Sequence, residues 1–268
     1  MNRKYNLMEK IGGGSFGTVY KGQNIRTNEF VAIKVEPIEA GINLLKNESI
    51  IYQYLHNCVG VPTVKWFGRD ELNYYMVINL LGKSLQTIHT QKKSFSLKLV
   101  LQLGIKIIQL LQNIHAQGLV HRDIKPDNFL LGTDTDRNNI YIIDFGFCKT
   151  YIRDDQHILL SKTSNLIGSL TYASTNAHDF NELSRRDDME SVGYMLIYFY
   201  FGYLPWQNII EDDDVHIKIK ELKQTIVIEW GVPSVIIDYI NYINQLDFYD
   251  EPDYNLLINN FEKQIELL

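Results

Sequence analysis

The segment His121-Arg122-Asp123-Ile124-Lys125-Pro126-Asp127-Asn128, followed sixteen residues later by Asp144-Phe145-Gly146, decides how this chain is interpreted. The carboxylate of Asp123 can accept or orient a proton, and Lys125 can neutralise negative charge that develops in a transition state. Asn128 and Asp144 offer an amide oxygen and a hard carboxylate, which are ligands that Mg²⁺ prefers. The spacing therefore predicts a catalytic loop followed by a metal-binding loop.

A glycine-rich segment lies near the N-terminus. In Ile11-Gly12-Gly13-Gly14-Ser15-Phe16-Gly17-Thr18-Val19 the missing Cβ atoms let backbone N–H groups approach phosphate oxygens closely. Alone this is a weak indication, because a glycine-rich hairpin need not bind a ligand. A dinucleotide-binding fingerprint would also continue directly into a helix, whereas Thr18-Val19-Tyr20 predicts a returning strand. We therefore assign Ile11 through Val19 to the binding of nucleotide phosphates.

Val31-Ala32-Ile33-Lys34 predicts a strand that carries a lysine. In residues 44–55, helical spacing places Glu48 on the same face as Leu44, Ile51 and Leu55. A carboxylate on an apolar face requires a partner. Taken alone, Lys34 could be a surface lysine and Glu48 a helix-end charge. Together with the other motifs, the pattern predicts that Glu48 holds Lys34 against the α- and β-phosphates of ATP.

The chain divides into a strand-rich N-terminal region and a helical C-terminal region. Residues 30–35 and 74–80 predict strands, whereas apolar residues recur at helical spacing from 97 to 114 and stop near Gly118. We expect an α+β fold with two lobes: a small, mainly β lobe over residues 1–82 and a larger, mainly α lobe over residues 83–268. The ligand site is expected in the cleft between them.

Composition and charge restrict the class of protein. The 268 residues are 45% hydrophobic and 22% charged, with a formal net charge of -6. This charge argues against a binder of phosphate backbones, so we expect no nucleic-acid partner. The chain has two cysteines, Cys58 and Cys148, and no CxxC pair, so neither a disulfide framework nor a zinc site is predicted. An intracellular location is expected, with the cytoplasm first and the nucleus as the alternative.

No apolar segment of the kind that a secretory signal needs lies near the N-terminus. The most apolar stretch, residues 192–206, is interrupted by Gly193 and Gly202 and is too short to span a bilayer comfortably. We interpret it as a buried core helix, and we expect no transmembrane segment.

Residues 5–262 resemble a protein kinase domain, and the second half resembles the casein kinase 1 group in particular. Ser174-Thr175-Asn176 stands where that group has Ser-Ile-Asn and most kinases have Ala-Pro-Glu. Three further segments resemble the same group: Ser184-Arg185-Arg186-Asp187-Asp188-Met189-Glu190-Ser191, Leu204-Pro205-Trp206-Gln207 and Glu251-Pro252-Asp253-Tyr254. The resemblance implies a monomeric Ser/Thr kinase that uses ATP and Mg²⁺ and phosphorylates protein substrates.

The resemblance also implies roles for single residues. Asp123 would orient the acceptor hydroxyl, and Lys125 at its position is typical of Ser/Thr rather than Tyr kinases. Asn128 and Asp144 would hold Mg²⁺, and Asp188 would brace the catalytic loop. Five apolar residues would surround adenine, Ile78 as the gatekeeper and Leu81 through its backbone, although plain core packing is an alternative for several of them: Ala32, Ile78, Leu81, Leu130 and Ile143.

The sequence departs from the family where phosphorylated substrates bind. Gly168-Ser169-Leu170-Thr171-Tyr172 has Thr171 in place of the family's arginine, and the acidic run Glu211-Asp212-Asp213-Asp214 replaces a basic one. We expect a weakened preference for substrates that are already phosphorylated. One positive charge could be restored by a nearby cation, and the candidates are Lys162, Arg185, Arg186, Lys218 and Lys220.

The family resemblance further implies activity without phosphorylation of the activation segment. Arg122 could nevertheless receive a phosphate from that segment. The hydroxyl residues available for phosphorylation there are Ser161, Thr163, Ser164, Ser169 and Thr171.

Two other functions remain open. A pseudokinase scaffold would bind ATP and proteins without turnover, but such a protein usually loses a glycine, the lysine, the aspartate or the metal ligand, and all of these are kept here. A small-molecule kinase is the other alternative, and the family-specific second half disfavours it.

Overall fold

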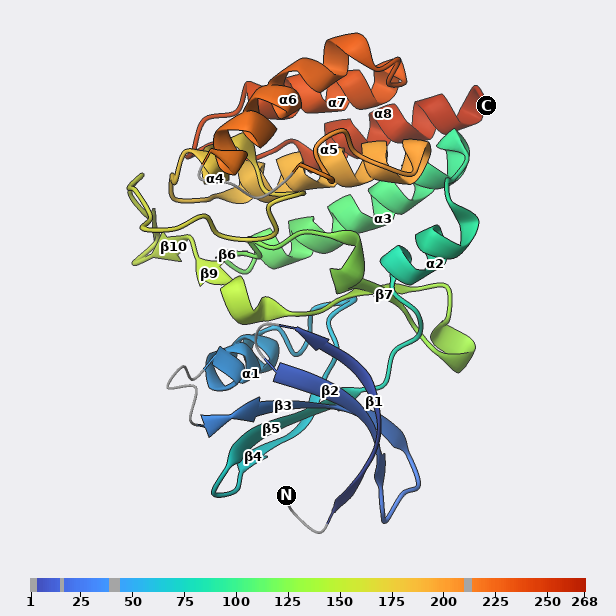
Figure 1. The fold of residues 1–268 in the computed structure, drawn as a ribbon, viewed down its shortest axis with the longest axis vertical. Helices are drawn as coiled ribbons and strands as arrows, with labels where there is room; N and C mark the ends of the chain where they lie inside the picture. Colours follow the sequence, from blue (N-terminus) through green and yellow to red (C-terminus); the bar gives the residue numbers. More distant parts are fainter. Residues whose placement is uncertain (1–3, 15–16, 39–43, 210–213) are drawn as a thin grey trace. The chain divides into compact units, whose positions relative to one another are not determined.

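The computed structural model describes residues 4–14, 17–38, 44–209 and 214–268 (Figure 1). The chain separates into two compact units. The first comprises Met1–Lys83 and Phe129–Gly146, and the second comprises Ser84–Asn128 and Phe147–Leu268. The N-terminal segment of the first unit thus ends at Lys83, just after the expected boundary at residue 82, and the unit also takes in Phe129–Gly146.

The first unit contains a five-stranded antiparallel sheet in the order β1-β2-β3-β5-β4. The strands expected at residues 30–35 and 74–80 are present as β3 and β5, and Thr18-Val19-Tyr20 lies in β2 as predicted. The bounds are β1 Tyr5–Gly14, β2 Gly17–Asn24, β3 Phe30–Pro37, β4 Val64–Arg69 and β5 Asn73–Asn79.

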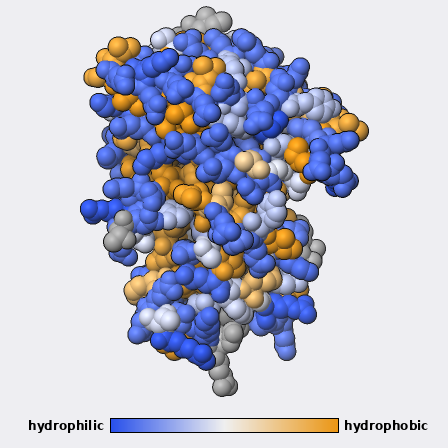
Figure 2. Space-filling model, turned by 180° about the vertical axis from the view of Figure 1, so that it is seen from behind, coloured by the Kyte–Doolittle hydropathy of each residue, from blue (hydrophilic) through white to orange (hydrophobic). Residues whose placement is uncertain are grey.

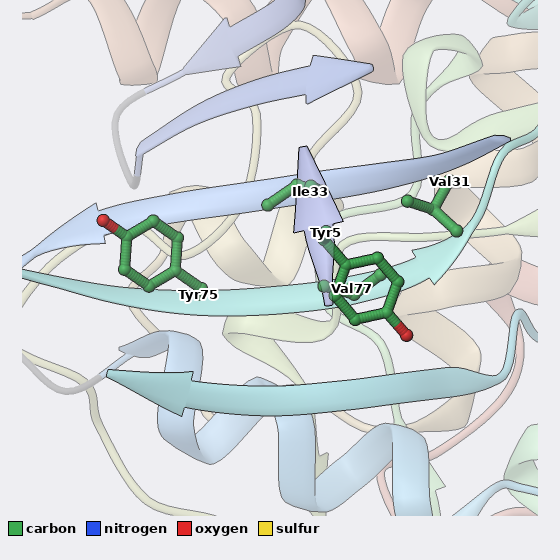
Figure 3. Packing of buried hydrophobic residues seen from close by; sticks show 5 residues of the cluster. All are labelled: Tyr5, Val31, Ile33, Tyr75 and Val77. Carbon is green, nitrogen blue, oxygen red and sulfur yellow. The ribbon is translucent and has the colours of Figure 1, made fainter. Parts of the chain in front are cut away.

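One face of this sheet carries a hydrophobic cluster from β1, β3 and β5, shown in Figure 3: Tyr5, Val31, Ile33, Tyr75 and Val77. Because side chains alternate along a strand, the residues between these positions face the opposite side of the sheet. Ala32 pairs with Ile78 across β3 and β5, and Lys34 pairs with Met76. The alternation therefore fixes Ala32, Lys34 and Ile78 on one common face.

Helix α1, Leu44–Tyr54, is held to the sheet at its first turn, where the backbone N–H of Leu45 donates to Oε2 of Glu36 at 2.7 Å. The sequence predicted this helix, but the face that it buries is rotated relative to the predicted face. Glu48 and Leu55 are buried as expected, whereas Leu44 and Ile51 are only half-buried. Leu45, Ser49 and Tyr52 are buried beside Glu48 instead.

A small hairpin completes the first unit. It pairs β7, Phe129–Leu131, with β8, Ile140–Ile142, and includes the short helix η3, Asp134–Asp136. Backbone hydrogen bonds join it to the rest of the unit, from Gly82 N–H to the Leu131 carbonyl at 2.8 Å and from Ile142 N–H to the Gly60 carbonyl at 2.9 Å. This hairpin places the following Asp144 in the same unit as Lys34 and Glu48.

The second unit is mainly helical, with α5 at its centre between α3 and α7 (Figure 1). Ser84, Ser96 and Ser174 begin α2, α3 and α4, because each hydroxyl accepts a backbone N–H three residues later. The helix bounds are α2 Leu85–Lys92, α3 Leu97–His115, α4 Thr175–His178, α5 Arg185–Phe201, α6 Val215–Glu229, α7 Ser234–Asn244 and α8 Tyr254–Glu266.

Short elements connect these helices. Strand β6, Leu119–Val120, pairs with β9, Lys149–Thr150, and β10, Ile152–Arg153, pairs with β11, Gln156–His157. Two single-turn helices, η2 over Pro126–Asn128 and η4 over Phe145–Phe147, lie in the two loops singled out by the sequence.

The expected core helix in residues 192–206 is α5, which ends at Phe201 because Gly202 takes a left-handed φ of 89°.

Among the described residues, α3 is the helix long and apolar enough to cross a membrane by length and composition, although a core helix meets the same criteria. Gly104 lets α3 pack closely, since a Cβ there would lie 2.8 Å from Phe261 of α8 and 3.1 Å from Leu196 of α5. Hydrophilic residues cover most of the face in Figure 2.

Candidate active site

Lys34 forms two ion pairs in the first unit. Its Nζ lies 2.7 Å from Oε2 of Glu48 on α1 and 2.9 Å from Oδ1 of Asp144. The side chains of Lys34 and Glu48 are 14% and 2% exposed, and that of Asp144 is 27% exposed. The expected Lys34–Glu48 pair is therefore present, and Asp144 keeps part of its carboxylate accessible.

Burial alone would lower the pKa of Lys34, but the carboxylates of Glu48 and Asp144 outweigh burial and raise it above its ordinary value. Lys34 is therefore a permanent cation in this site. A fixed positive charge with its position set by two carboxylates is suited to bind phosphate oxygens.

Tyr52 is a site residue that the sequence analysis missed. The hydroxyl of this buried side chain accepts the backbone N–H of Asp144 at 3.1 Å, and its ring meets Phe145 edge-on at 4.9 Å between centroids. The backbone of Phe145 also forms a hydrogen bond with Glu48. Asp144 has a φ of 68°, which a non-glycine residue rarely adopts. Contacts from α1 thus hold the strained Asp144 loop in place.

The predicted phosphate-binding segment includes the end of β1 and the start of β2. Its register pairs Gly12 with Val19, Gly13 with Thr18 and Gly14 with Gly17. Gly17 has a φ of 137°, and a Cβ there would lie 2.3 Å from the Val35 carbonyl oxygen, so glycine is required. Ile11 is 48% exposed at the start of the hairpin. Ser15 and Phe16, also assigned to nucleotide binding, lie outside the described residues.

The five residues predicted to surround adenine all belong to the first unit. Ala32 is buried and pairs across the sheet with Ile78, on the face that carries Lys34. Leu81, Leu130 and Ile143 are half-buried, as is Ile78. Their roles in adenine binding remain predictions.

Asp123 is the centre of a hydrogen-bonded cluster in the second unit, and it is 3% exposed. Lys125 Nζ lies 2.6 Å from its Oδ2, and the Ser169 hydroxyl donates to its Oδ1 at 2.9 Å. Lys125 also donates to Ser169 at 3.1 Å. Ser169 was regarded only as a site for phosphorylation, but its hydroxyl is part of this cluster.

Asn128 donates its amide nitrogen to the backbone carbonyl of Asp123 at 2.8 Å and to its Oδ2 at 3.3 Å. The amide oxygen is therefore the atom that Asn128 can offer to a metal ion. Oxygen donors of this kind, together with a partly exposed carboxylate such as Asp144, fit Mg²⁺ that also binds phosphate and water oxygens. The donor types that Asn128 and Asp144 offer thus fit the expected metal.

Asp188 braces the catalytic loop, as predicted. Its two carboxylate oxygens accept the backbone N–H groups of His121 at 2.7 Å and Arg122 at 2.8 Å, and His115 Nε2 lies 2.9 Å away. Burial alone would raise the pKa of Asp188, but the hydrogen bonds from His115 and His121 hold it below its usual value. Because Arg122 has a φ of 68°, this carboxylate stabilises a strained backbone.

Glu182 is a second residue that the sequence analysis missed. It is 4% exposed and binds two cations, Arg122 with 3.2 Å between Nη1 and Oε1, and Lys149 through its Oε2. Arg122 also donates its Nε to the Phe147 carbonyl at 2.6 Å. The position where Arg122 could receive a phosphate is thus occupied by an internal carboxylate.

Comparison with known families agrees with this geometry. A family model described as the protein kinase domain matches residues 5–259, which is most of the chain. The five-stranded antiparallel sheet and the mainly helical second unit are those of the bilobal protein kinase fold. The match and the site together show that the chain belongs to the protein kinase family.

Proposed function

We propose that this protein is an ATP-dependent protein Ser/Thr kinase of the casein kinase 1 type. The observation that carries the proposal is the pair of contacts made by Lys34, at 2.7 Å to Glu48 and 2.9 Å to Asp144. Protein kinases require both the lysine–glutamate pair and the metal-binding aspartate to be in place for turnover. A scaffold that only binds ATP has no need to keep this arrangement.

The residues divide the work of phosphoryl transfer. Lys34 would bind the α- and β-phosphates, and Asn128 and Asp144 would hold Mg²⁺, which would supply positive charge next to the phosphates. Asp123 orients the acceptor hydroxyl, and Lys125, 2.6 Å from Asp123, neutralises charge on the transferred group. Lys125 and the family-like second half support Ser/Thr acceptors on proteins.

The partners of the candidate cations support the proposed weak preference for phosphorylated substrates, because most of these cations already bind other groups of the chain. Lys220 places its Nζ 2.7 Å from both carboxylate oxygens of Asp179. Arg185 donates to the Tyr249 carbonyl, and Arg186 donates to the Leu246 carbonyl. Three of the five candidates thus already have partners within the chain.

The two other candidate cations, Lys162 and Lys218, also have partners within the chain. Lys162 donates to the backbone carbonyl of Asp179 at 2.9 Å, beside the carboxylate that binds Lys220, and Lys218 also has interactions of its own. In the acidic run, Glu211, Asp212 and Asp213 lie outside the described residues, and Asp214 precedes α6.

Activity without phosphorylation of the activation segment is supported by Glu182. Arg122 and Lys149 already contact its carboxylate, which carries the negative charge that a phosphate would otherwise bring. Enzyme treated with phosphatase is expected to keep most of its activity. A large loss after that treatment would contradict this aspect of the proposal.

An intracellular, cytoplasmic location and a monomeric state complete the proposal. Both cysteines are free thiols. Burial raises the pKa of Cys58 and raises that of Cys148 to about 12, so neither is a reactive thiolate at neutral pH. Unreactive free thiols are compatible with a reducing compartment.

The test is transfer of labelled γ-phosphate from Mg-ATP to casein and to matched peptides with and without an upstream phosphoserine. Asp144→Asn is the inactive control, and sugar and lipid acceptors test the small-molecule alternative. We expect incorporation into protein by the wild type alone, with little gain from the phosphoserine. Tight binding of Mg-ATP without incorporation would favour the scaffold, and strong stimulation by phosphoserine would refute the weakened preference.

A further inference from the structure

Lys223 on α6 is a buried lysine with no role in the site described above. Only 2% of it is exposed, although an unpaired charge is costly to remove from water. Its Nζ donates to the backbone carbonyls of Leu170 at 3.1 Å and Ala173 at 2.6 Å, and lies 3.0 Å from Nε2 of His178. Two of its three partners are thus backbone oxygens of one short segment, residues 168–174.

The same segment is held at its other positions. Trp206 Nε1 donates to the Thr171 carbonyl at 2.7 Å, and the Ser174 hydroxyl donates to Asp187 at 2.7 Å. Lys223 Nζ also lies 4.8 Å from the ring centroid of Tyr194 and 5.4 Å from that of Trp206. Lys223 therefore contacts two aromatic rings, and one of them, Trp206, also binds the segment.

The segment borders the catalytic loop at its first residues. A Cβ on Gly168, which has a φ of 91°, would lie 2.5 Å from the Arg122 carbonyl oxygen. The next residue, Ser169, donates to Asp123 at 2.9 Å. A shift of the segment would therefore move groups that touch the residue expected to orient the acceptor hydroxyl.

We propose that Lys223 is a positioning residue that fixes the backbone of residues 168–174, and so sets how the protein acceptor is placed beside Asp123. This inference rests on the proposed kinase function. An aliphatic side chain could fill the same volume but could not bind the Leu170 and Ala173 carbonyls. Lys223 thus acts through the segment and touches neither nucleotide nor acceptor.

The protonation of the neighbours is compatible with this role. Burial and the nearby Lys223 lower the pKa of His178 to about 3, so its imidazole is neutral. A protonated Lys223 donates to both carbonyls and to Nε2 of His178, whereas a neutral Lys223 keeps the two carbonyl bonds and accepts from Nε2–H of the other tautomer. The segment keeps both backbone bonds in either state.

The first test compares Lys223→Met with wild type in peptide kinetics. We expect kcat/KM for a peptide acceptor to fall about tenfold or more, while KM for ATP changes less than about twofold. The matched control is Ile219→Ala, at a buried position one helical turn earlier on α6 whose apolar side chain cannot donate a hydrogen bond. The control is expected to lower stability without a selective loss toward the peptide.

The second test measures hydrogen exchange of the amides in residues 168–174 of the full chain. Faster exchange in Lys223→Met than in Ile219→Ala is expected, and equal exchange would overturn the inference.

If Lys223→Met does not fold, Trp206→Phe provides a second variant. This change removes the bond to the Thr171 carbonyl and should give the same selective loss toward the peptide, but a smaller one. Unchanged peptide kinetics in the folded variant would also overturn the inference. A wild type that transfers no phosphate would refute the proposed function, and the exchange comparison would then decide the inference alone.

Discussion

Replacing Asp188 by asparagine should destabilise the protein and disable its catalytic loop. One oxygen of Asp188 accepts Arg122 N–H at 2.8 Å, and the other accepts His121 N–H at 2.7 Å with His115 Nε2 at 2.9 Å. An asparagine must turn its NH₂ group toward one of these donors, so at least one hydrogen bond to a charged acceptor is lost. Such a bond contributes about 1.5–3 kcal/mol.

The strain at Arg122 does not add to this cost, but it favours movement of the loop once a hydrogen bond is lost. Its φ of 68° is tolerated while Asp188 holds the adjoining N–H groups, and a strained residue of this kind costs about 1–3 kcal/mol. Because relaxation of the loop releases part of this strain, we expect the free energy of unfolding to fall by no more than the hydrogen bond contributes, about 1.5–3 kcal/mol, which most domains survive. Relaxation of the loop should also displace Asp123, and a displacement of about 1 Å can lower kcat about a hundredfold.

Urea denaturation and steady-state kinetics on the same preparations measure both effects. Asp238→Asn is the matched control, because it removes the same charge from an exposed position on α7 of the same unit. A loss in Asp188→Asn of less than about 0.5 kcal/mol, the range expected for surface changes, would refute the argument. A normal kcat would refute the link between Asp188 and the catalytic loop.

Three further changes test other contacts. Glu182→Gln should lower kcat about tenfold, because Arg122 loses its anionic partner; unchanged steady-state kinetics would contradict that. Tyr52→Phe should cost about 1 kcal/mol in chemical denaturation, since the Asp144 N–H loses an acceptor, and a neutral result would deny Tyr52 that role. Burial lowers the pKa of Lys223 from 10.5 in the unfolded chain to about 7 in the folded protein. Between these two pH values, Lys223 is protonated in the unfolded chain and largely neutral in the folded protein. Wild type should therefore gain stability relative to Lys223→Met from pH 7 to pH 9, by up to about 1.4 kcal/mol per pH unit in denaturant titrations, and parallel curves would exclude that shift.

The sequence predicted those regions of the site that lie in short motifs. The spacing of Asp123, Asn128 and Asp144 needs no knowledge of the fold, and alternation along β3 places Lys34 on one face of the sheet. The partner of Lys34 was also predictable, because helical spacing puts Glu48 on the same face as aliphatic side chains. In each case a local pattern carried the information.

The residues that were missed depend on contacts between distant regions of the chain. Tyr52 meets Asp144 across 92 residues, and Glu182 meets Arg122 across 60. Lys223 meets Ala173 across 50 residues. No local pattern distinguishes these side chains from ordinary core or surface residues. The turned face of α1 has the same origin, because the contact of Tyr52 with Phe145 selects which side of the helix is buried.

The charges of the site are matched within the chain itself. Lys34 has Glu48 and Asp144, Asp123 has Lys125, and Arg122 has Glu182, each pair within 3.2 Å. Groups held in this way need little rearrangement when charge develops during phosphoryl transfer, which is the main requirement of electrostatic catalysis. A carboxylate such as Glu182 cannot be removed by a phosphatase. Control of this kinase is therefore expected at the binding of the protein acceptor, where Lys223 and Trp206 position the backbone, rather than at the assembly of the catalytic groups.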